Sequence, residues 1–336
     1  MSVSGMIDTP SDARAALLES LGIEAPWHAE TIGHGRNSRV ERIGNARGEW
    51  ILKRYHAGGP QSRDRLGTEY AFLGYLNAQG VASVARPVGL DREAHLAVYT
   101  KLTGTRIAAI TDDAVSQAAA FICDINAHTA SPQAGALPMA ADACASWGDH
   151  LALVRARIAQ LGQIEPASDV ERDARHFVER TLAPAWQAIE ATLIAHPSAA
   201  DRVTPILSPS DFGFHNALDD HGTLSFVDFE YAGWDDPAKL ACDFICQPEL
   251  PVGHAQGMQF VDVIAQHLAP RTTFVERVSL LLPVHRLKWC CILLNEFRAE
   301  HRARRLHAGV SSEDLLAVQL DKARRYFARH IGSTQE

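Results

Sequence analysis

Three side chains that carry oxygen atoms follow one another closely in the second half of the chain. In "LSPSDFGFHNAL", Asp211 stands five residues before Asn216, and Asp228 opens "DFEY" soon afterwards. Carboxylate and amide oxygens on adjacent strand ends are the ligands from which a magnesium and phosphate site can be built. Ordinary turns also use Asp and Asn, so each motif alone is common.

The D-x-x-x-x-N spacing is that of a phosphotransfer catalytic loop. In such a loop the Asp accepts the proton of the attacking hydroxyl, and the Asn coordinates magnesium. Asp228 follows the apolar "LSFV", where the main metal-binding carboxylate is expected. Magnesium suits this set because it takes oxygen ligands and keeps waters while it bridges phosphates. The pattern predicts Asp211 as the base, with Asn216 and Asp228 as metal ligands.

Two glycines and a lysine nearer the N-terminus fit the same chemistry. Gly33 and Gly35 in "TIGHGRNSRVERIG" precede an alternating segment, which predicts a hairpin tip whose N–H groups can reach phosphates. A plain hairpin turn fits them equally well. Lys53 in "EWILKRY" follows three apolar residues, a pattern typical of the kinase strand whose Lys contacts the α and β phosphates. A strand Lys is also commonly just solvated.

Glu69 is the expected partner of this lysine. It lies three residues after Leu66 and four before Leu73, on the apolar face of a predicted helix. A carboxylate that faces inward needs a cation, and Lys53 is the candidate. The alternative is a Glu at the edge of the apolar stripe that reaches solvent.

The elements that must position these residues predict two lobes. Strand-like segments and two helices, near 11–22 and 62–79, favour a small antiparallel sheet in residues 1–102. From about Gly104 the periodicity is helical, with strand character confined to about 204–230. The predicted class is α+β, with a nucleotide-binding lobe over residues 1–102 and a mainly helical catalytic and substrate lobe over 103–336.

Composition is that of an ordinary globular protein. The 336 residues are 46% hydrophobic and 21% charged, and the formal charge of −8 argues against a general nucleic-acid binder. No signal peptide is visible, and charges and Pro283 interrupt the most apolar stretch, which predicts a cytoplasmic protein without membrane spans. The six cysteines lack a histidine pair at zinc spacing, so reduced and mostly buried thiols are expected.

With these motifs in this order, the chain resembles the aminoglycoside phosphotransferase and choline kinase superfamily. The resemblance spans roughly residues 28–300 and is most specific in "SDFGFHNAL" and "FVDFEYAGWDDPAKLACDF". It implies a two-lobed protein-kinase-like fold, ATP as donor and Mg²⁺ as cofactor. It gives Asp211, Asn216, Asp228, Lys53 and Glu69 the roles described above. It also implies that the backbone from Thr100 to Leu102, in "VYTKLTG", meets the adenine ring.

Two departures from the family pattern leave a question open. The family usually has His two residues before the catalytic Asp, where this chain has Pro209, and Ser38 replaces the third glycine of the phosphate loop. The Ser38 hydroxyl can still donate to a phosphate oxygen. Two hypotheses follow: an active small-molecule kinase, or a nucleotide-binding, kinase-like regulator with weakened catalysis.

The expected acceptor is a hydroxyl of a small molecule. After Asp228, "FEYAGWDDP" leads directly into a predicted helix, which leaves no segment long enough to hold a peptide. Aromatic and acidic residues of the helical lobe would suit a cationic head group, although each is also a typical core or helix-surface residue. A sugar, an amino sugar or an amino alcohol all fit. The candidate lining residues are Tyr231, Trp234, Asp243, Trp289 and Glu296.

Overall fold

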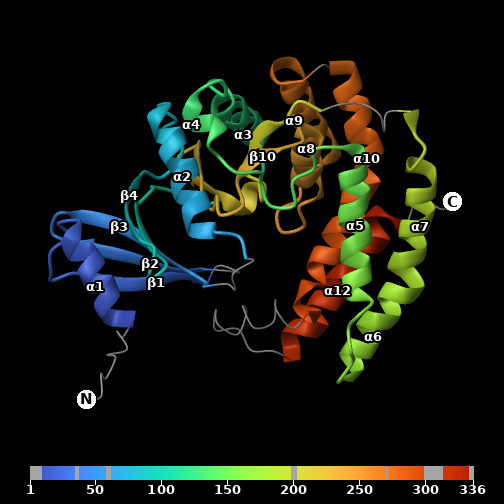
Figure 1. The fold of residues 1–336 in the computed structure, drawn as a ribbon, viewed down its shortest axis with the longest axis horizontal. Coiled ribbons are helices and arrows are strands. Elements are labelled where there is room, and N and C mark those ends of the chain that lie inside the picture. The colour runs from blue at the N-terminus through green and yellow to red at the C-terminus, as the bar shows by residue number, and fades with distance from the viewer. Residues whose placement is uncertain are drawn as a thin grey trace, which may run out of the picture.

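The structure is a computed structural model that describes residues 10–34, 38–57, 62–197, 203–269, 271–298 and 313–332. Strands near the N-terminus form a sheet at one end of the molecule, and helices make up most of the other end (Figure 1). This arrangement of a sheet-bearing lobe and a larger helical lobe confirms the predicted α+β class.

An antiparallel sheet forms the core of the N-terminal lobe. Its strands stand in the order β1-β2-β3-β5-β4, and every neighbouring pair is antiparallel. The strands are β1 (His28–His34), β2 (Ser38–Asn45), β3 (Gly48–Tyr55), β4 (Pro87–Asp91) and β5 (Leu96–Thr100). Lys53 lies on the central strand, between Val40 of β2 and Ala97 of β5.

The two faces of this sheet differ because side chains alternate along each strand. Leu52 and Leu96 are fully buried on the face that α1 (Pro10–Ser20) covers. Lys53, the next residue on β3, is buried on the opposite face, toward α2 (Arg65–Ala78). The alternation of the strand therefore directs the lysine to the helix that carries Glu69.

The start of α2 is fixed by a local cap. Asp64 precedes the helix, and its carboxylate accepts a hydrogen bond of 2.8 Å from the backbone N–H of Gly67. A Cβ atom at position 67 would lie 2.1 Å from that carboxylate, so the close approach requires glycine. Leu66, Glu69 and Leu73 are all buried, as expected for one face of a helix.

Helices build the C-terminal lobe around an aromatic core. Within this core the rings of Phe121 and Phe226 are 4.5 Å apart, and those of Phe244 and Phe260 are 4.1 Å apart. The helices are α3 (Asp112–Ile125), α4 (Pro132–Gly135), α5 (Trp147–Leu161), α6 (Asp169–Phe177), α7 (Ala183–Leu193), α8 (Pro237–Cys246), α9 (His254–His267), α10 (Arg271–Leu293) and α12 (Glu313–His330). A π-helical turn, Val178–Leu182, joins α6 to α7.

Two small sheets carry the loops that hold the candidate chemistry. One has the order β6-β8-β9 and consists of β6 (Thr105–Arg106), β8 (Ala217–Asp220) and β9 (Thr223–Phe226). The other pairs β7 (Ile206–Ser208) with β10 (Gly233–Asp235). The loop after β7 and the loop between β9 and β10 contain the predicted catalytic and metal-binding residues.

The expectation that strand character is confined to about 204–230 is wrong at β6 and β10. Both strands are too short to show alternation, with two and three residues, and they form because β8 and β7 pair with them in the fold. All six cysteines are free thiols, and five of them are buried. No helix in the described ranges combines the length and the apolar character that a membrane span needs.

Candidate active site

Lys53 and Glu69 form a buried ion pair between β3 and α2. The lysine Nζ lies 2.7 Å from Oε2 and 3.0 Å from Oε1 of the glutamate. The side chains are only 9% and 4% exposed, so both charges are largely removed from water. Buried charges are stable only when each has an opposite charge at hydrogen-bond distance. The predicted pairing of these two residues is confirmed.

A second carboxylate reaches the same lysine from the helical lobe. Oδ1 of Asp228 lies 2.9 Å from Lys53 Nζ, although the two residues are 175 positions apart in the chain. Burial opposes the charge of the lysine, but Asp228 and Glu69 hold its pKa well above the usual value. Lys53 is therefore cationic at neutral pH and joins the two lobes at this point.

Asp228 adopts a backbone conformation that few side chains accept. Its φ angle is +71°, in the left-handed region that Asp and Asn tolerate better than most residues. The side chain remains 37% exposed, while Phe229, the next residue, is buried and donates its N–H to Glu69 at 3.3 Å. The sharp turn thus buries Phe229 and leaves the Asp228 carboxylate at an accessible surface.

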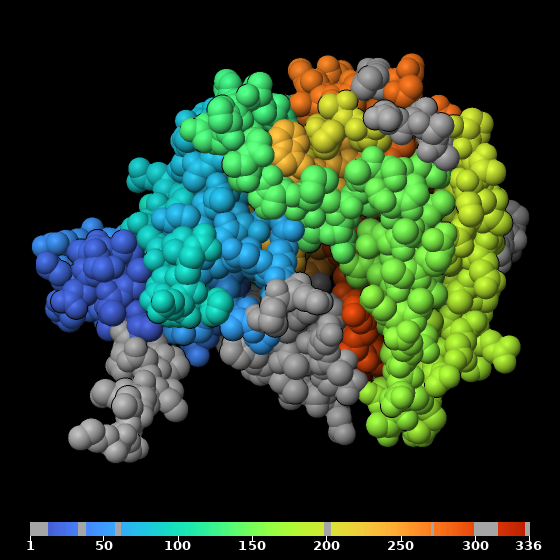
Figure 2. Space-filling view, in the orientation of Figure 1, coloured from blue at the N-terminus to red at the C-terminus, as the bar shows by residue number. Residues whose placement is uncertain are grey.

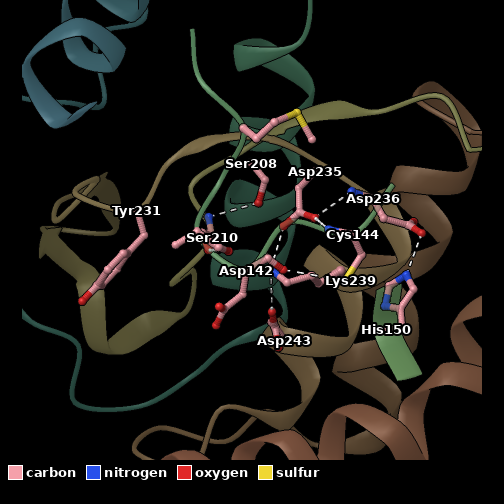
Figure 3. Close-up of polar contacts among 12 residues, drawn as sticks. Asp142, Cys144, His150, Ser208, Ser210, Tyr231, Asp235, Asp236, Lys239 and Asp243 are labelled. Carbon is pink, nitrogen blue, oxygen red and sulfur yellow. Dashed lines mark hydrogen bonds and ion pairs between the residues drawn. The ribbon is translucent and has the colours of Figure 1, made fainter. Parts of the chain in front are cut away.

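The loop that carries Asp211 is held by serine hydroxyls. The N–H of Ser210 donates to the Ser208 hydroxyl at 3.0 Å, and the Ser210 hydroxyl contacts the carbonyl of Ala141 at 3.3 Å (Figure 3). Ser210 has a φ angle of +69°, and the N–H of Asp211 donates to the Pro209 carbonyl at 3.0 Å. These bonds turn the chain sharply after β7 and leave the Asp211 side chain 36% exposed.

Asn216 connects the two loops. Its Nδ2 donates to the Asp211 carbonyl at 2.9 Å, and its own carbonyl accepts from the N–H of Val227 at 3.0 Å. Because Nδ2 is engaged, the amide oxygen is the end of the side chain that remains to accept a cation. An amide oxygen and the carboxylate of Asp228 are hard oxygen donors, and this donor set fits Mg²⁺.

The predicted phosphate loop is described only in part. Gly33 lies in β1 and pairs with Val40, whereas Gly35 is outside the described residues. Ser38 begins β2, is 6% exposed and stands opposite Tyr55 on β3. In the sheet, Ser38 therefore lies beside β3, the strand that carries Lys53, and β1 lies on the other side of β2.

The predicted adenine contacts follow β5. Thr100 is the last residue of β5; its N–H donates to the carbonyl of Arg86 at 2.9 Å, and its hydroxyl accepts from the Arg86 N–H at 2.9 Å. Leu102 follows in the irregular segment between β5 and β6 and is partly exposed. Both residues lie where the chain passes from the large sheet to the helical lobe.

Two of the predicted acceptor contacts meet inside the helical lobe. The indole N–H of Trp289 donates to Asp243 at 2.9 Å, and Asp243 also pairs with Lys288 and, at 3.4 Å, with Lys239. Burial opposes ionisation of Asp243, but Lys288 and Lys239 hold its pKa well below the usual value. The structure brings the two residues together at 2% and 6% exposure; their contact with an acceptor stays a prediction.

The other three acceptor candidates are spread over the same lobe. Trp234 in β10 is partly buried and donates to the carbonyl of Ala134 at 3.0 Å. The Tyr231 ring lies beneath the Arg65 guanidinium, 5.7 Å away, and burial raises the pKa of the tyrosine. Glu296 is 8% exposed in a 3₁₀ turn after α10.

Sequence reasoning missed three residues at the site. The hydroxyl of Tyr55 donates to Glu69 at 2.6 Å, and the alternation of β3 could have indicated it because Tyr55 stands two residues after Lys53. His215 places Nε2 3.2 Å from Oδ1 of Asp211. Asp142 follows Ala141, whose carbonyl contacts Ser210, and it pairs with Arg157 of α5. Its φ angle is +52°, and no local sequence pattern indicates its position.

The candidate catalytic and metal-binding residues come from both lobes. Figure 2 shows a recess between α2 and α5, at the junction of the two lobes. Lys53 and Glu69 come from the sheet-bearing lobe, and Asp211, Asn216 and Asp228 come from the loops of the small sheets. The arrangement is a set of one cation and several oxygen donors at a lobe boundary, which suits the binding and transfer of phosphate.

Comparison with known proteins agrees with this geometry. The model of the phosphotransferase enzyme family matches residues 28–276. Comparison with curated protein sequences yields no match. One similar solved structure is an ethanolamine kinase from Plasmodium vivax, with a TM-score of 0.61 and 11% identity over 99% of this chain and 97% of that chain.

Two further solved structures share the fold. A choline/ethanolamine kinase family protein from Mesorhizobium loti has a TM-score of 0.58 and 15% identity over 97% of this chain and 99% of that one. A spectinomycin phosphotransferase, solved with ADP and spectinomycin, has a TM-score of 0.58 and 12% identity over 92% and 97% of the two chains. At such identities the likeness shows the fold.

Proposed function

The chain belongs to the phosphotransferase enzyme family, and from this premise we propose that it moves the γ-phosphate of ATP to a hydroxyl of a small molecule. The contact of Lys53 with both Glu69 and Asp228 carries the proposal. It joins the lysine that would hold phosphates to the carboxylate that would hold the metal.

In this mechanism Asp211 is the general base. Its carboxylate accepts the proton of the acceptor hydroxyl while the hydroxyl oxygen bonds to the γ-phosphorus and the bond to the leaving ADP breaks. The exposed position of Asp211 after β7 supports this role, because an acceptor can reach the carboxylate. Its backbone is fixed by Asn216, so the base and the amide move together.

Asn216 and Asp228 would hold Mg²⁺. When bound, the ion would supply positive charge that neutralises the charge developing on the transferred phosphate. Both residues present oxygen atoms, and the N–H of Val227 ties their loops together. Lys53 would then contact the α and β phosphates while Glu69 keeps it in place.

The N-terminal lobe would bind the rest of ATP. Gly33 pairs with Val40 of β2, and Ser38 stands opposite Tyr55, two residues after Lys53 on β3, which supports a role for these two residues in phosphate binding. Thr100 to Leu102 would face the adenine ring. We place the boundary between the nucleotide-binding lobe and the catalytic lobe at residues 102 and 103.

A small acceptor suits the fold better than a peptide. Helix α8 begins at Pro237, so only residues 229–236 separate it from Asp228. A segment of that length cannot form the docking surface that protein kinases use. The similar solved structures include proteins named as an ethanolamine kinase and a spectinomycin phosphotransferase, which supports an amino alcohol, amino sugar or sugar as acceptor.

The proposal is tested by transfer of labelled phosphate from ATP to pooled sugars, amino alcohols and aminoglycosides. We expect magnesium-dependent labelling of one pool, and its loss in Asp211→Ala. ATP binding without hydrolysis or transfer to any pool would instead indicate the nucleotide-binding regulator. Failure to bind ATP with magnesium would contradict both functions.

A further inference from the structure

A histidine of the same loop lies beside the Asp211 carboxylate. His215 Nε2 lies 3.2 Å from Asp211 Oδ1, and the histidine side chain is only 11% exposed. A carboxylate can only accept a hydrogen bond, so a hydrogen bond between these two groups needs the ring proton on Nε2. Nδ1 is buried and has no hydrogen-bond partner among the described residues. Within the described residues, the polar contact of this ring is therefore the one with Asp211.

Local structure holds the histidine ring in this position. Phe214 to Asn216 form a 3₁₀ turn, and the N–H of Asn216 donates to the Gly213 carbonyl at 3.0 Å. A Cβ atom at position 213 would lie 3.0 Å from His215 Nδ1, so the missing side chain makes room for the ring. Phe212 and Phe214 are 2% and 1% exposed and anchor the turn in the aromatic core.

We propose that His215 is a positioning residue for the base. This inference rests on the proposed function of Asp211. The Nε2–H group donates to Oδ1 and fixes the plane of the carboxylate, so that the other oxygen receives the acceptor proton. Because a displacement of about 1 Å at a reacting group can cost about 10²-fold in rate, a fixed plane matters for turnover. It matters little for ATP binding, since Lys53 would hold the phosphates and Asp228 the metal.

Two amide substitutions separate a hydrogen-bonding role from simple packing. The amide nitrogen of Gln lies as many bonds from Cβ as Nε2 of His, whereas that of Asn corresponds to Nδ1. We expect His215→Ala to lower kcat by about 10- to 100-fold with little change in KM for ATP. His215→Gln should recover most of this loss, and His215→Asn should behave like the alanine variant.

A double variant shows whether His215 acts through Asp211. In the Asp211→Asn background the base is absent, so the further change His215→Ala should have almost no additional effect on turnover. His221→Asn is the matched control, because His221 is 99% exposed and lies 3.9 Å from Asp220 in the turn between β8 and β9. It should retain the activity of the unchanged protein.

The readouts are magnesium-dependent ATP turnover, phosphate transfer to the acceptor found by screening, and ATP affinity by calorimetry. If His215→Ala and His215→Gln lose activity equally, or if both keep full activity while Asp211→Asn is inactive, the positioning role is wrong. Equal losses in both Asp211 backgrounds would show a structural role only. If the unchanged protein and Asp211→Asn have the same turnover, the role of Asp211 as the base fails instead. If the unchanged protein neither turns over ATP nor transfers phosphate, the proposed function fails.

Discussion

Asp228 contacts Lys53 and, in the proposed function, would also hold the metal. Oδ1 contacts Lys53, and the φ angle of +71° limits which side chains can replace it. Asn accepts this backbone and keeps the size of the side chain but removes its charge. We expect Asp228→Asn to weaken magnesium-dependent ATP binding about tenfold or more, because a charged ligand present in the ground state is lost. Calorimetry with and without magnesium measures this change, and an unaltered magnesium dependence would exclude Asp228 as a ligand.

Replacement of Asp211 should lower the transfer rate and leave ATP affinity nearly unchanged, in contrast to replacement of Asp228. The Asp211 carboxylate is needed when the acceptor proton leaves, so Asp211→Asn should lower transfer by about 10²-fold or more. ATP affinity should stay nearly unchanged, because Lys53, Asn216 and Asp228 remain. Transfer rates with the screened acceptor, measured beside calorimetric affinities, test this. Full activity in the Asn variant would mean that another group is the base.

At the scale of elements, the segment before α2 ties the helix to the opposite lobe. The Arg63 guanidinium donates to the carbonyls of Met139, at 2.9 Å, and Ala232, at 2.8 Å, and also reaches those of Glu230 and Tyr231. One side chain thus joins the start of α2 to the loop between β9 and β10, which carries Asp228, and to the segment beside Ser210. Glu69 on the same helix joins it to Lys53. The position of α2 and the geometry of this loop therefore depend on each other.

Loss of Arg63 should accordingly destabilise the protein. We expect Arg63→Ala to lower the free energy of unfolding by about 1.5–3 kcal/mol, the range for hydrogen bonds to a charged group. Arg92→Ala is the control, because Arg92 pairs with Asp64 at 64% and 62% exposure, and such surface pairs contribute about 0–1 kcal/mol. Urea unfolding of both variants measures the difference. Equal effects would mean that the contacts of Arg63 contribute little.

At the scale of the whole molecule, a buried polar chain runs through the helical lobe. His150 Nε2 lies 2.9 Å from Asp236, and its Nδ1 lies 3.0 Å from Nε2 of His285 (Figure 3 shows the Asp236 contact). The Arg277 guanidinium also binds Asp236 at 2.6 Å, which keeps that carboxylate an acceptor. His150 therefore donates to Asp236. These polar contacts link α5, the start of α8 and α10.

These buried polar contacts make the stability of the protein depend on pH. Burial lowers the pKa of His285 to about 3, from 6.5, although Asp243 acts in the opposite direction and Lys288 and His150 add to the lowering. Between pH 6.5 and about 3, the unfolded chain binds a proton at this residue that the folded protein does not. The free energy of unfolding should therefore fall as the pH falls, by about 1.4 kcal/mol per pH unit from this group.

The substitution His285→Gln tests this dependence. Its amide can still form a hydrogen bond with His150, but the group no longer titrates. Denaturant unfolding between pH 7 and 4 should give a shallower loss of stability in the variant than in the unchanged protein. The exposed His221 again provides a control, since His221→Asn should leave the slope as it is. Identical slopes in all three proteins would mean that His285 titrates alike in the folded and unfolded states.

The sequence by itself determined the features that depend on local spacing. The period of a helix turns Glu69 inward, and the alternation of a strand turns Lys53 away from Leu52, so their pairing could be predicted. The order of the motifs, with Asp211, Asn216 and Asp228 last, also predicted the two-lobed fold and the family. These inferences needed no knowledge of how the lobes pack.

The tertiary structure alone decided which distant groups meet. Lys53 contacts Asp228 across 175 positions, and Asp243 and Trp289 contact each other across 46, because the packing of separate elements is not encoded in local periodicity. The contact of His215 with Asp211 spans only four residues, but it depends on an irregular turn anchored by buried phenylalanines. Such turns have no repeating pattern, so this contact became visible only in the fold.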